Sequence, residues 1–326
     1  MEKLRLTLGC WDYDRTRPLF DGRVQAEGIE LRFEVARPHV TFSRMQDTRE
    51  LDVSEMSLAT YVSMVGKGGC PFVAIPVALS KIFRHSCIYV RPDAGIARPE
   101  DLKGKRVGAI RYGSTGTVFM RGMLQDEYGL RAEDVRWFLG RLNTATDPIN
   151  TDRGLPPGVA AEPLRPDQTL EGMLQAGELD ALMSLYIPEA FEAGAPWIAR
   201  LFPNFKQAEQ ESYRRARIFP IMHTVVIRRE VYDANPWVAA SLYRALCEAR
   251  DIAVDGLYDT DALRLALPWL IDHVEEARRV LGADFWSYGL EANRPTWAAI
   301  GRYVAEQGLS PRVVSADELF LPGVES

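Results

Sequence analysis

One group of residues combines three kinds of reactive side chain: Arg84, His85 and Ser86. A permanent cation is followed by an imidazole that titrates near neutral pH and by a hydroxyl. An apolar run at 72–79 precedes the group, and a β-rich run at 87–90 follows it. Polar side chains between two strand-like runs predict the mouth of a ligand cleft, where His85 would donate a proton. The alternative is a surface loop whose arginine and histidine are only solvated.

A second group lies in the loop after the first predicted strand, residues 4–8. The loop contains Asp14 and Arg15, and another carboxylate, Glu55, stands near the end of a predicted strand at 51–57. In open α/β sheets, loops at the carboxyl ends of strands bind ligands. We expect Arg15 to hold a carboxylate through its planar fork, and Glu55 or Asp14 to accept a proton. Glu55 is equally well explained as a solvated carboxylate.

A third group is the turn between a predicted strand at 106–110 and a predicted helix at 117–128. A glycine-containing polar turn at that position points backbone N–H groups at an anion. Neither GxGxxG nor GxxxxGK[ST] occurs here, so a carboxylate fits better than a nucleotide. The alternative is an ordinary turn with a hydroxyl cap. The turn residues expected to bind substrate are Arg111, Tyr112, Ser114 and Thr115.

Three other features are open to two interpretations each. Tyr186, at the tip after a predicted strand at 180–185, binds a ligand or packs on the edge of a lobe. His223 lies in a β-rich run, where a lone histidine is more often structural than functional, and we keep it as a substrate-binding candidate. The Pro- and Gly-rich stretch 140–167 is a lid or a plain insertion.

Composition limits the class of protein. The chain has 326 residues, of which 47% are hydrophobic and 26% charged, which is typical of a globular protein with two lobes. Its net charge of −6 shows no basic stripe, so nucleic-acid binding is not expected. The four cysteines lack CxxC pairing, and the N-terminus lacks an apolar signal core. We therefore expect a cytoplasmic protein that does not bind membranes.

No metal or cofactor site is predicted. Clustered histidine, cysteine and carboxylate residues would indicate a metal site, and no such cluster is recognised in the sequence, so we expect metal-independent chemistry without a cofactor. The sequence is compatible with a homo-oligomer but does not fix the oligomeric state. The histidines are His39, His85, His223 and His273.

The order of predicted elements favours an α/β protein of two lobes with a ligand cleft between them. β-rich segments near 88–92 and 220–228 are interpreted as crossings between the lobes. Lobe 1 would then comprise 1–91 plus 225–326, and lobe 2 would comprise 92–224. An Asn-Pro start predicts a long helix after residue 236, followed by helices at 260–269 and 272–281.

This layout resembles type II periplasmic-binding-protein folds, and several stretches resemble the 4,5-dihydroxyphthalate decarboxylase family in particular. They span nearly the whole chain in the expected order. The stretches are Asp12-Tyr13-Asp14-Arg15-Thr16, Leu51-Asp52-Val53-Ser54-Glu55-Met56-Ser57-Leu58, Phe83-Arg84-His85-Ser86, Asp101-Leu102-Lys103-Gly104-Lys105, Arg121-Gly122-Met123-Leu124, Ile218-Phe219-Pro220-Ile221-Met222-His223 and Asp284-Phe285-Trp286-Ser287-Tyr288-Gly289.

The resemblance implies a carboxy-lyase of aromatic compound catabolism and phthalate degradation. Its partner would be a small hydroxylated aromatic carboxylate, decarboxylated without oxidation. The alternatives are a non-catalytic solute-binding protein for a small carboxylate, or a lyase or hydrolase acting on a related one.

Two departures from the family pattern leave the exact substrate open. The pattern leads us to expect an acidic residue and Tyr-Gln where Arg111-Tyr112-Gly113 stands. It also leads us to expect a Pro-Arg tip where Leu185-Tyr186 stands.

Overall fold

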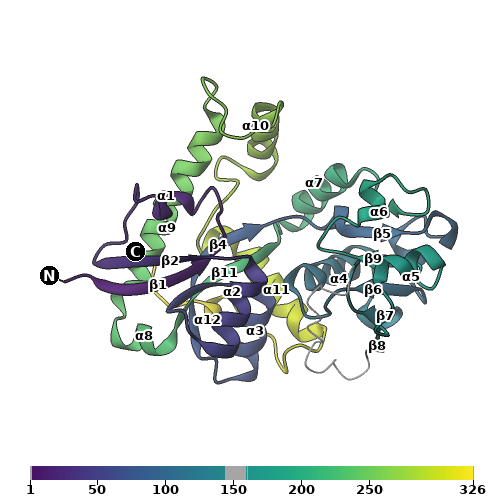
Figure 1. The fold of residues 1–326 in the computed structure, drawn as a ribbon, viewed down its shortest axis with the longest axis horizontal. Helices are drawn as coiled ribbons and strands as arrows, with labels where there is room; N and C mark the ends of the chain where they lie inside the picture. The colour runs from purple at the N-terminus through teal and green to yellow at the C-terminus, as the bar shows by residue number, and fades with distance from the viewer. Residues whose placement is uncertain (1, 144–158, 160, 326) are drawn as a thin grey trace. The chain divides into compact units, whose positions relative to one another are not determined.

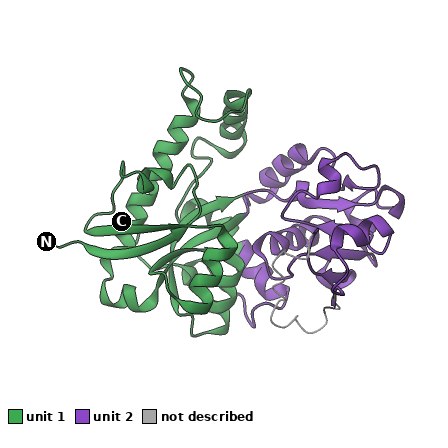
Figure 2. Cartoon of the chain, viewed as in Figure 1, with its two compact units in different colours: residues 1–81, 221–298, 314–326 green, residues 82–220, 299–313 purple. Residues whose placement is uncertain are grey.

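The computed structural model describes residues 2–143, 159 and 161–325. The chain divides into two compact units, coloured separately in Figure 2. Most of the stretch predicted as a lid, 144–158 and 160, lies outside the described residues. Unit 1 contains residues 1–81, 221–298 and 314–326, and unit 2 contains residues 82–220 and 299–313.

The unit boundaries differ from the lobe boundaries predicted above. The chain leaves unit 1 after Lys81 and returns at Ile221. Residues 88–90 form a strand inside the sheet of unit 2, so they are not a crossing. Residues 299–313, predicted in lobe 1, belong to unit 2 because their side chains bond there: the Tyr303 hydroxyl donates to Asp126 at 2.6 Å.

A five-stranded sheet in the order β2-β1-β3-β11-β4 forms the centre of unit 1 (Figure 1). β1 runs parallel to β2 and β3, whereas β11 runs antiparallel to β3 and β4. All five residues of β3 are buried. Lys81 of β4 pairs with Ile221 of β11. The strands are β1 (Leu4–Cys10), β2 (Ile29–Val35), β3 (Val53–Ser57), β4 (Phe72–Lys81) and β11 (Ile221–Arg228).

Helices complete unit 1, and Figure 1 shows α10 standing beyond the end of α9, away from the sheet. The Asn-Pro start of α9 is confirmed, but the helix predicted at 260–269 is wrong. Its leucines 263, 265 and 267 are exposed and alternate, so they form no single buried helix face. The helices are α1 (Arg17–Phe20), α2 (Pro38–Ser43), α3 (Leu58–Lys67), α8 (Arg229–Ala234), α9 (Trp237–Asp255), α10 (Leu270–Leu281), α12 (Ala316–Leu319) and α11 (Arg294–Glu306), which ends in unit 2.

Unit 2 contains a six-stranded sheet in the order β10-β5-β9-β6-β7-β8. β6 is parallel to β7 and β9, and β5 is antiparallel to β9. Among the described residues, every helix is too short or too polar to cross a bilayer. The strands are β5 (Ile88–Val90), β6 (Arg106–Ala109), β7 (Arg136–Leu139), β8 (Ala161–Pro163), β9 (Ala181–Met183) and β10 (Ala199–Arg200); the helices are α4 (Thr115–Tyr128), α5 (Leu170–Ala176), α6 (Glu189–Glu192) and α7 (Phe205–Ala216).

Candidate active site

Strand register brings Glu55 and His223 together in unit 1. Glu55 is the central residue of β3 and pairs with Val225 of β11, while Ser57 pairs with His223. Residues two apart in a strand share a face, so Glu55 and His223 are diagonal neighbours on one face of the sheet. They are 168 positions apart in the sequence, and the His223 Nδ1 lies 2.6 Å from the Glu55 Oε1.

The Glu55 carboxylate accepts hydrogen bonds from two further groups in the loop after β1. The Tyr13 hydroxyl donates to Oε1 at 2.5 Å, and the Trp11 backbone N–H donates to Oε2 at 3.1 Å. Because β1 and β3 are parallel neighbours, this loop begins beside the end of β3. The position matches the rule that ligand-binding loops follow the carboxyl ends of strands.

The electrostatics of the group favour an ionised Glu55. Burial alone would raise its pKa, but His223 and the hydrogen bonds from Tyr13 and Trp11 lower the pKa below its ordinary value. Burial, together with the charge of Glu55, raises the pKa of Tyr13, so the phenol keeps its proton and donates. An ionised carboxylate can only accept, which assigns the Nδ1 hydrogen of His223 to the bond with Glu55.

The second ring nitrogen of His223 is available for chemistry. Nε2 has no hydrogen-bond partner among the described residues, and the side chain is 18% exposed. The Phe42 ring meets the imidazole edge-on, with ring centroids 5.0 Å apart, which limits rotation. A carboxylate that orients a histidine and stabilises its cation is the arrangement used in general acid–base catalysis. His223 can therefore give or take a proton at Nε2.

Arg15 places a cation in the same unit. Its guanidinium lies over the Tyr13 ring, 4.0 Å from the centroid, and the ring of Tyr13 connects it to Glu55. The Arg15 Nε donates to the Leu79 carbonyl of β4, and Nη1 donates to Asp14 at 3.0 Å. Nη2 has no hydrogen-bond partner within the described part of the chain. The predicted site residues Asp14, Arg15, Glu55 and His223 thus belong to unit 1.

His85, the proton donor favoured by the sequence, has a different environment in unit 2. It is 3% exposed, and neither ring nitrogen has a hydrogen-bond partner in the described structure. The nearest carboxylate, Glu209, lies 4.0 Å from Nδ1. Burial lowers the pKa of His85 to about 4, so the ring is neutral at pH 7 and has no acidic proton to donate readily.

The predicted anion turn in unit 2 is assembled around Gly116. A Cβ at this glycine would come within 3.2 Å of the Arg84 Nε and 2.4 Å of a Leu185 methyl carbon. Arg84 therefore packs on the first turn of α4, beside the tip that precedes Tyr186. Ser114 is the N-cap residue of α4, but its side chain makes no capping hydrogen bond: its hydroxyl bonds to the Thr117 hydroxyl at 2.7 Å.

The remaining predicted residues are less suited to contact a ligand. Tyr112 is fully buried in the core of unit 2, with the Arg121 guanidinium 3.6 Å from its ring centroid, so its expected role in substrate binding is not supported by its position. Thr115 is also buried. The Ser86 N–H donates to Glu209 at 3.4 Å, whereas the Tyr186 side chain is largely exposed.

Sequence reasoning missed Tyr13 and the Trp11 backbone. Both precede Asp14 in a stretch that it had already singled out, and a tyrosine two residues from a candidate arginine was a usable signal. The contact with Glu55 was not readable, because it depends on how β1 lies against β3.

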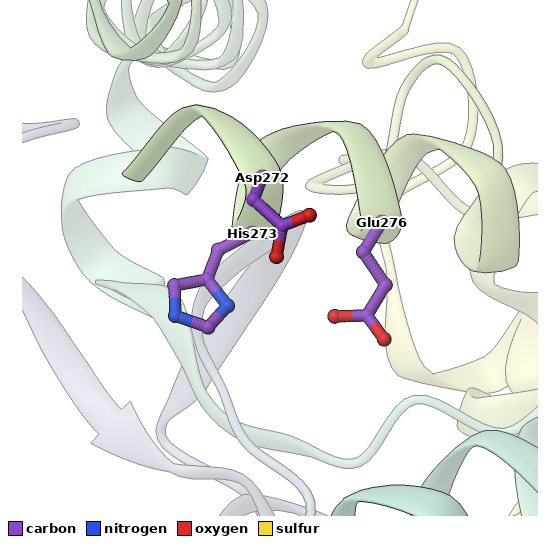
Figure 3. A group of neighbouring side chains, drawn as sticks. All are labelled: Asp272, His273 and Glu276. Atoms are coloured by element: carbon purple, nitrogen blue, oxygen red, sulfur yellow. The ribbon is translucent and has the colours of Figure 1, made fainter. Parts of the chain in front are cut away.

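One cluster on α10 has donor atoms close enough to hold a metal ion. The donor atoms of Asp272, His273 and Glu276 lie within 4.8 Å of one another (Figure 3). The expectation that no histidine, cysteine and carboxylate residues cluster at metal-ligand spacing overlooked this group. Asp272 and His273 are exposed, and exposed acidic groups commonly lie close together without binding an ion. The cluster shares no residue with the Glu55–His223 group, and the chemistry available to that group does not depend on it.

Comparisons with known proteins first define the class. Residues 13–149 match the family model described as "ABC transporter, phosphonate, periplasmic substrate-binding protein". The structure is similar to a putative periplasmic sulfonate-binding protein of Methylobacillus flagellatus, with a TM-score of 0.58, 14% identity, and coverage of 99% of this chain and 93% of that one. The fold is therefore that of the periplasmic solute-binding proteins.

Curated relatives then define the family. The chain is 37% identical to a 4,5-dihydroxyphthalate decarboxylase of Comamonas testosteroni over 99% of this chain and 98% of the relative. It is also 37% identical to a 4,5-dihydroxyphthalate decarboxylase of Pseudomonas putida, over 66% of this chain and 83% of the relative. The chain belongs to the 4,5-dihydroxyphthalate decarboxylase family.

Proposed function

We propose that the protein decarboxylates a hydroxylated aromatic dicarboxylate of the 4,5-dihydroxyphthalate type, without a redox cofactor. The observation that carries this proposal is the Glu55–His223 pair. The Arg15 guanidinium lies nearby, over the ring of Tyr13, whose hydroxyl bonds to Glu55. Family membership supplies the reaction class and the substrate class. The pair supplies a proton, and the arginine supplies a ligand for a carboxylate.

The reaction requires one proton and no change of oxidation state. The hydroxyl para to the departing carboxylate pushes electron density into the ring. A proton then adds to the carbon that carries that carboxylate, and the C–C bond breaks as its electrons return to the ring. CO₂ leaves, and 4,5-dihydroxyphthalate would become 3,4-dihydroxybenzoate. The proton consumed is regained from water.

Each residue of unit 1 has one task in this scheme. His223 donates from Nε2, while Glu55 holds Nδ1 and stabilises the imidazolium before transfer. Tyr13 keeps the Glu55 carboxylate in place. Arg15 holds the carboxylate that remains on the ring, through the free N–H groups at the end of its guanidinium. We assign the proton to His223 in preference to His85 because only His223 is paired with an ionised carboxylate.

Incubation of the purified chain with 4,5-dihydroxyphthalate tests the proposal. We expect CO₂ release with formation of 3,4-dihydroxybenzoate, and in D₂O we expect one deuterium at the carbon that lost CO₂. NMR of the product reads its position. A protein that binds the compound without releasing CO₂ would be a receptor and would refute the proposal.

The substrate range is tested with the same assay. The two departures from the family pattern, at Arg111-Tyr112-Gly113 and Leu185-Tyr186, leave the exact substrate to be determined. Phthalates that differ in hydroxyl position, compared by kcat/KM, separate 4,5-dihydroxyphthalate from related substrates. Repeating the assay after dialysis against a chelator tests the metal-independent mechanism.

A further inference from the structure

The stretch Asp284–Gly289 resembles the family pattern, yet no step above uses it. Its Trp286 lies in unit 1, on the chain between α10 and α11. The Arg15 guanidinium is 4.6 Å from a ring centroid of Trp286 and 4.0 Å from that of Tyr13. Arg15 therefore contacts two aromatic faces, and both contacts are within the range of cation–π attraction.

The segment that carries Trp286 is anchored beside it. The buried Lys81 ammonium donates to the Ser287 carbonyl at 2.8 Å and to the Asn293 side-chain oxygen at 2.8 Å. The Asn293 amide nitrogen donates in turn to the carbonyls of Ser287 and Gly289, each at 3.1 Å. These bonds fix the backbone next to Trp286 and limit movement of its ring.

Strand β4 supports both sides of the contact. The Leu79 carbonyl accepts from the Arg15 Nε, Lys81 is the last residue of the strand, and the Pro76 carbonyl accepts from the Gly289 N–H at 2.8 Å. The arginine and the tryptophan segment are thus tied to one rigid element. A long side chain held in this way loses little rotamer freedom when it binds an anion.

We propose that Trp286 is a positioning residue for substrate binding, which holds the guanidinium of Arg15 with its Nη atoms directed at the carboxylate of an aromatic acid. The inference rests on the proposed role of Arg15. Trp286 itself need not touch the substrate: its effect is transmitted through the arginine. Lys81 and Asn293 hold the tryptophan segment in register with β4.

A double-mutant cycle on the full chain tests this inference, with phthalate as the probe and isothermal titration as the measurement. We expect Trp286→Leu to weaken phthalate binding about tenfold and Trp286→Phe, which keeps an aromatic face, to restore most of it. In an Arg15→Met background, Trp286→Leu should cause no further loss. Thermal unfolding of each variant confirms that it is folded.

Trp237→Leu is the matched control. Trp237 is a half-exposed tryptophan of the same unit that packs against Gly28 and does not contact Arg15, so phthalate binding should remain unchanged. If Trp286→Leu and Arg15→Met weaken binding additively, the inference is overturned. Because the readout is binding, coupling between the two residues would stand even if the chain released no CO₂, in which case only the proposed function would fail.

Discussion

Two histidines that belong to or adjoin β-rich segments of this chain have opposite environments in the structure. His223 in unit 1 is partly exposed and bonds to an ionised carboxylate, while its other nitrogen remains available. His85 in unit 2 is buried, with no hydrogen-bond partner on either nitrogen in the described structure. Burial without a partner favours the neutral ring of His85, whereas the Glu55 carboxylate orients the ring of His223 through Nδ1. The comparison shows that the partner of a histidine, which its sequence neighbours do not reveal, decides how the ring is oriented and which nitrogen is left for chemistry.

The largest expected effect is the loss of turnover when His223, the proposed proton donor, is replaced. His223→Gln keeps hydrogen-bonding capacity but cannot titrate, so kcat should fall about 10²–10⁴-fold with KM little changed. His85→Gln is the matched control and should turn over at close to the wild-type rate. Steady-state kinetics with 4,5-dihydroxyphthalate measure both. A large loss in His85→Gln together with normal turnover in His223→Gln would return the proton donor to unit 2.

The second prediction concerns pH and the stability of unit 2. Burial lowers the pKa of His85 from 6.5 to about 4 and raises that of Glu209 from 4.5 to about 7. Between pH 7 and 4.5 the unfolded chain protonates its histidine before the folded chain does, so His85 alone lowers the free energy of unfolding on acidification. Glu209 does the reverse, because the folded chain protonates first. Each contribution is on the order of 2–3 kcal/mol, and because the two have opposite signs they largely cancel in the wild type.

Single variants expose the two opposed contributions. His85→Gln removes the histidine whose protonation in the unfolded chain lowers stability in acid. Relative to wild type, its free energy of unfolding should therefore rise as the pH falls from 7 to 4.5. Glu209→Gln should show the opposite trend. Urea denaturation at the two pH values measures both. If both variants follow the wild-type pH profile, the two groups do not have the opposed protonation behaviour described here.

The third prediction compares the cations of the two units. Arg15→Met should raise KM about 10- to 100-fold, since a charge-assisted bond to the substrate carboxylate is lost. Arg84→Met should raise it less, because Arg84 packs against Gly116 and its Nη1 faces the Cys87 sulfur at 3.6 Å. Kinetics on both variants separate the cases. A greater effect in Arg84→Met would place the principal carboxylate ligand in unit 2.

The smallest expected effect on turnover is that of replacing Tyr13, and it separates the role of the hydroxyl from that of the ring. Tyr13→Phe removes the hydrogen bond to Glu55 but keeps the ring beneath Arg15, so kcat should fall about tenfold with KM nearly unchanged. Tyr13→Leu removes the ring as well and should raise KM in addition. An equal KM for the two variants would show that the ring does not support Arg15.

Much of the fold was readable from the sequence, and the pairing inside the site was not. Alternating residues predicted the strands at 4–8 and 29–35, and both are present. Glu55 and His223 were each recognised as candidates, but their contact depends on the register of β3 against β11. His85 was preferred because it stands beside Arg84 and Ser86, whereas His223 is a lone histidine in an apolar run, where a structural role is more common. Residues 299–313 were misplaced because their bonds to unit 2, such as that of Tyr303, are between distant positions.

The pairing of Lys81 with Ile221 has a consequence for how such a chain can be assembled and re-engineered. The two residues are the last partners of neighbouring antiparallel strands, so β4 and β11 have the geometry of a hairpin whose connection is residues 82–220. The Ile82 N–H also donates to the Pro220 carbonyl at 3.0 Å, which keeps both ends of the connection together. Each doubling of a loop's length adds only about 0.6 kcal/mol to closure, so residues 82–220, which form most of unit 2, cost roughly 3 kcal/mol more to close than a turn of four residues. This hairpin is thus a natural junction for exchanging residues 82–220, together with 299–313 of the same unit, while the strands that carry Glu55 and His223 stay intact.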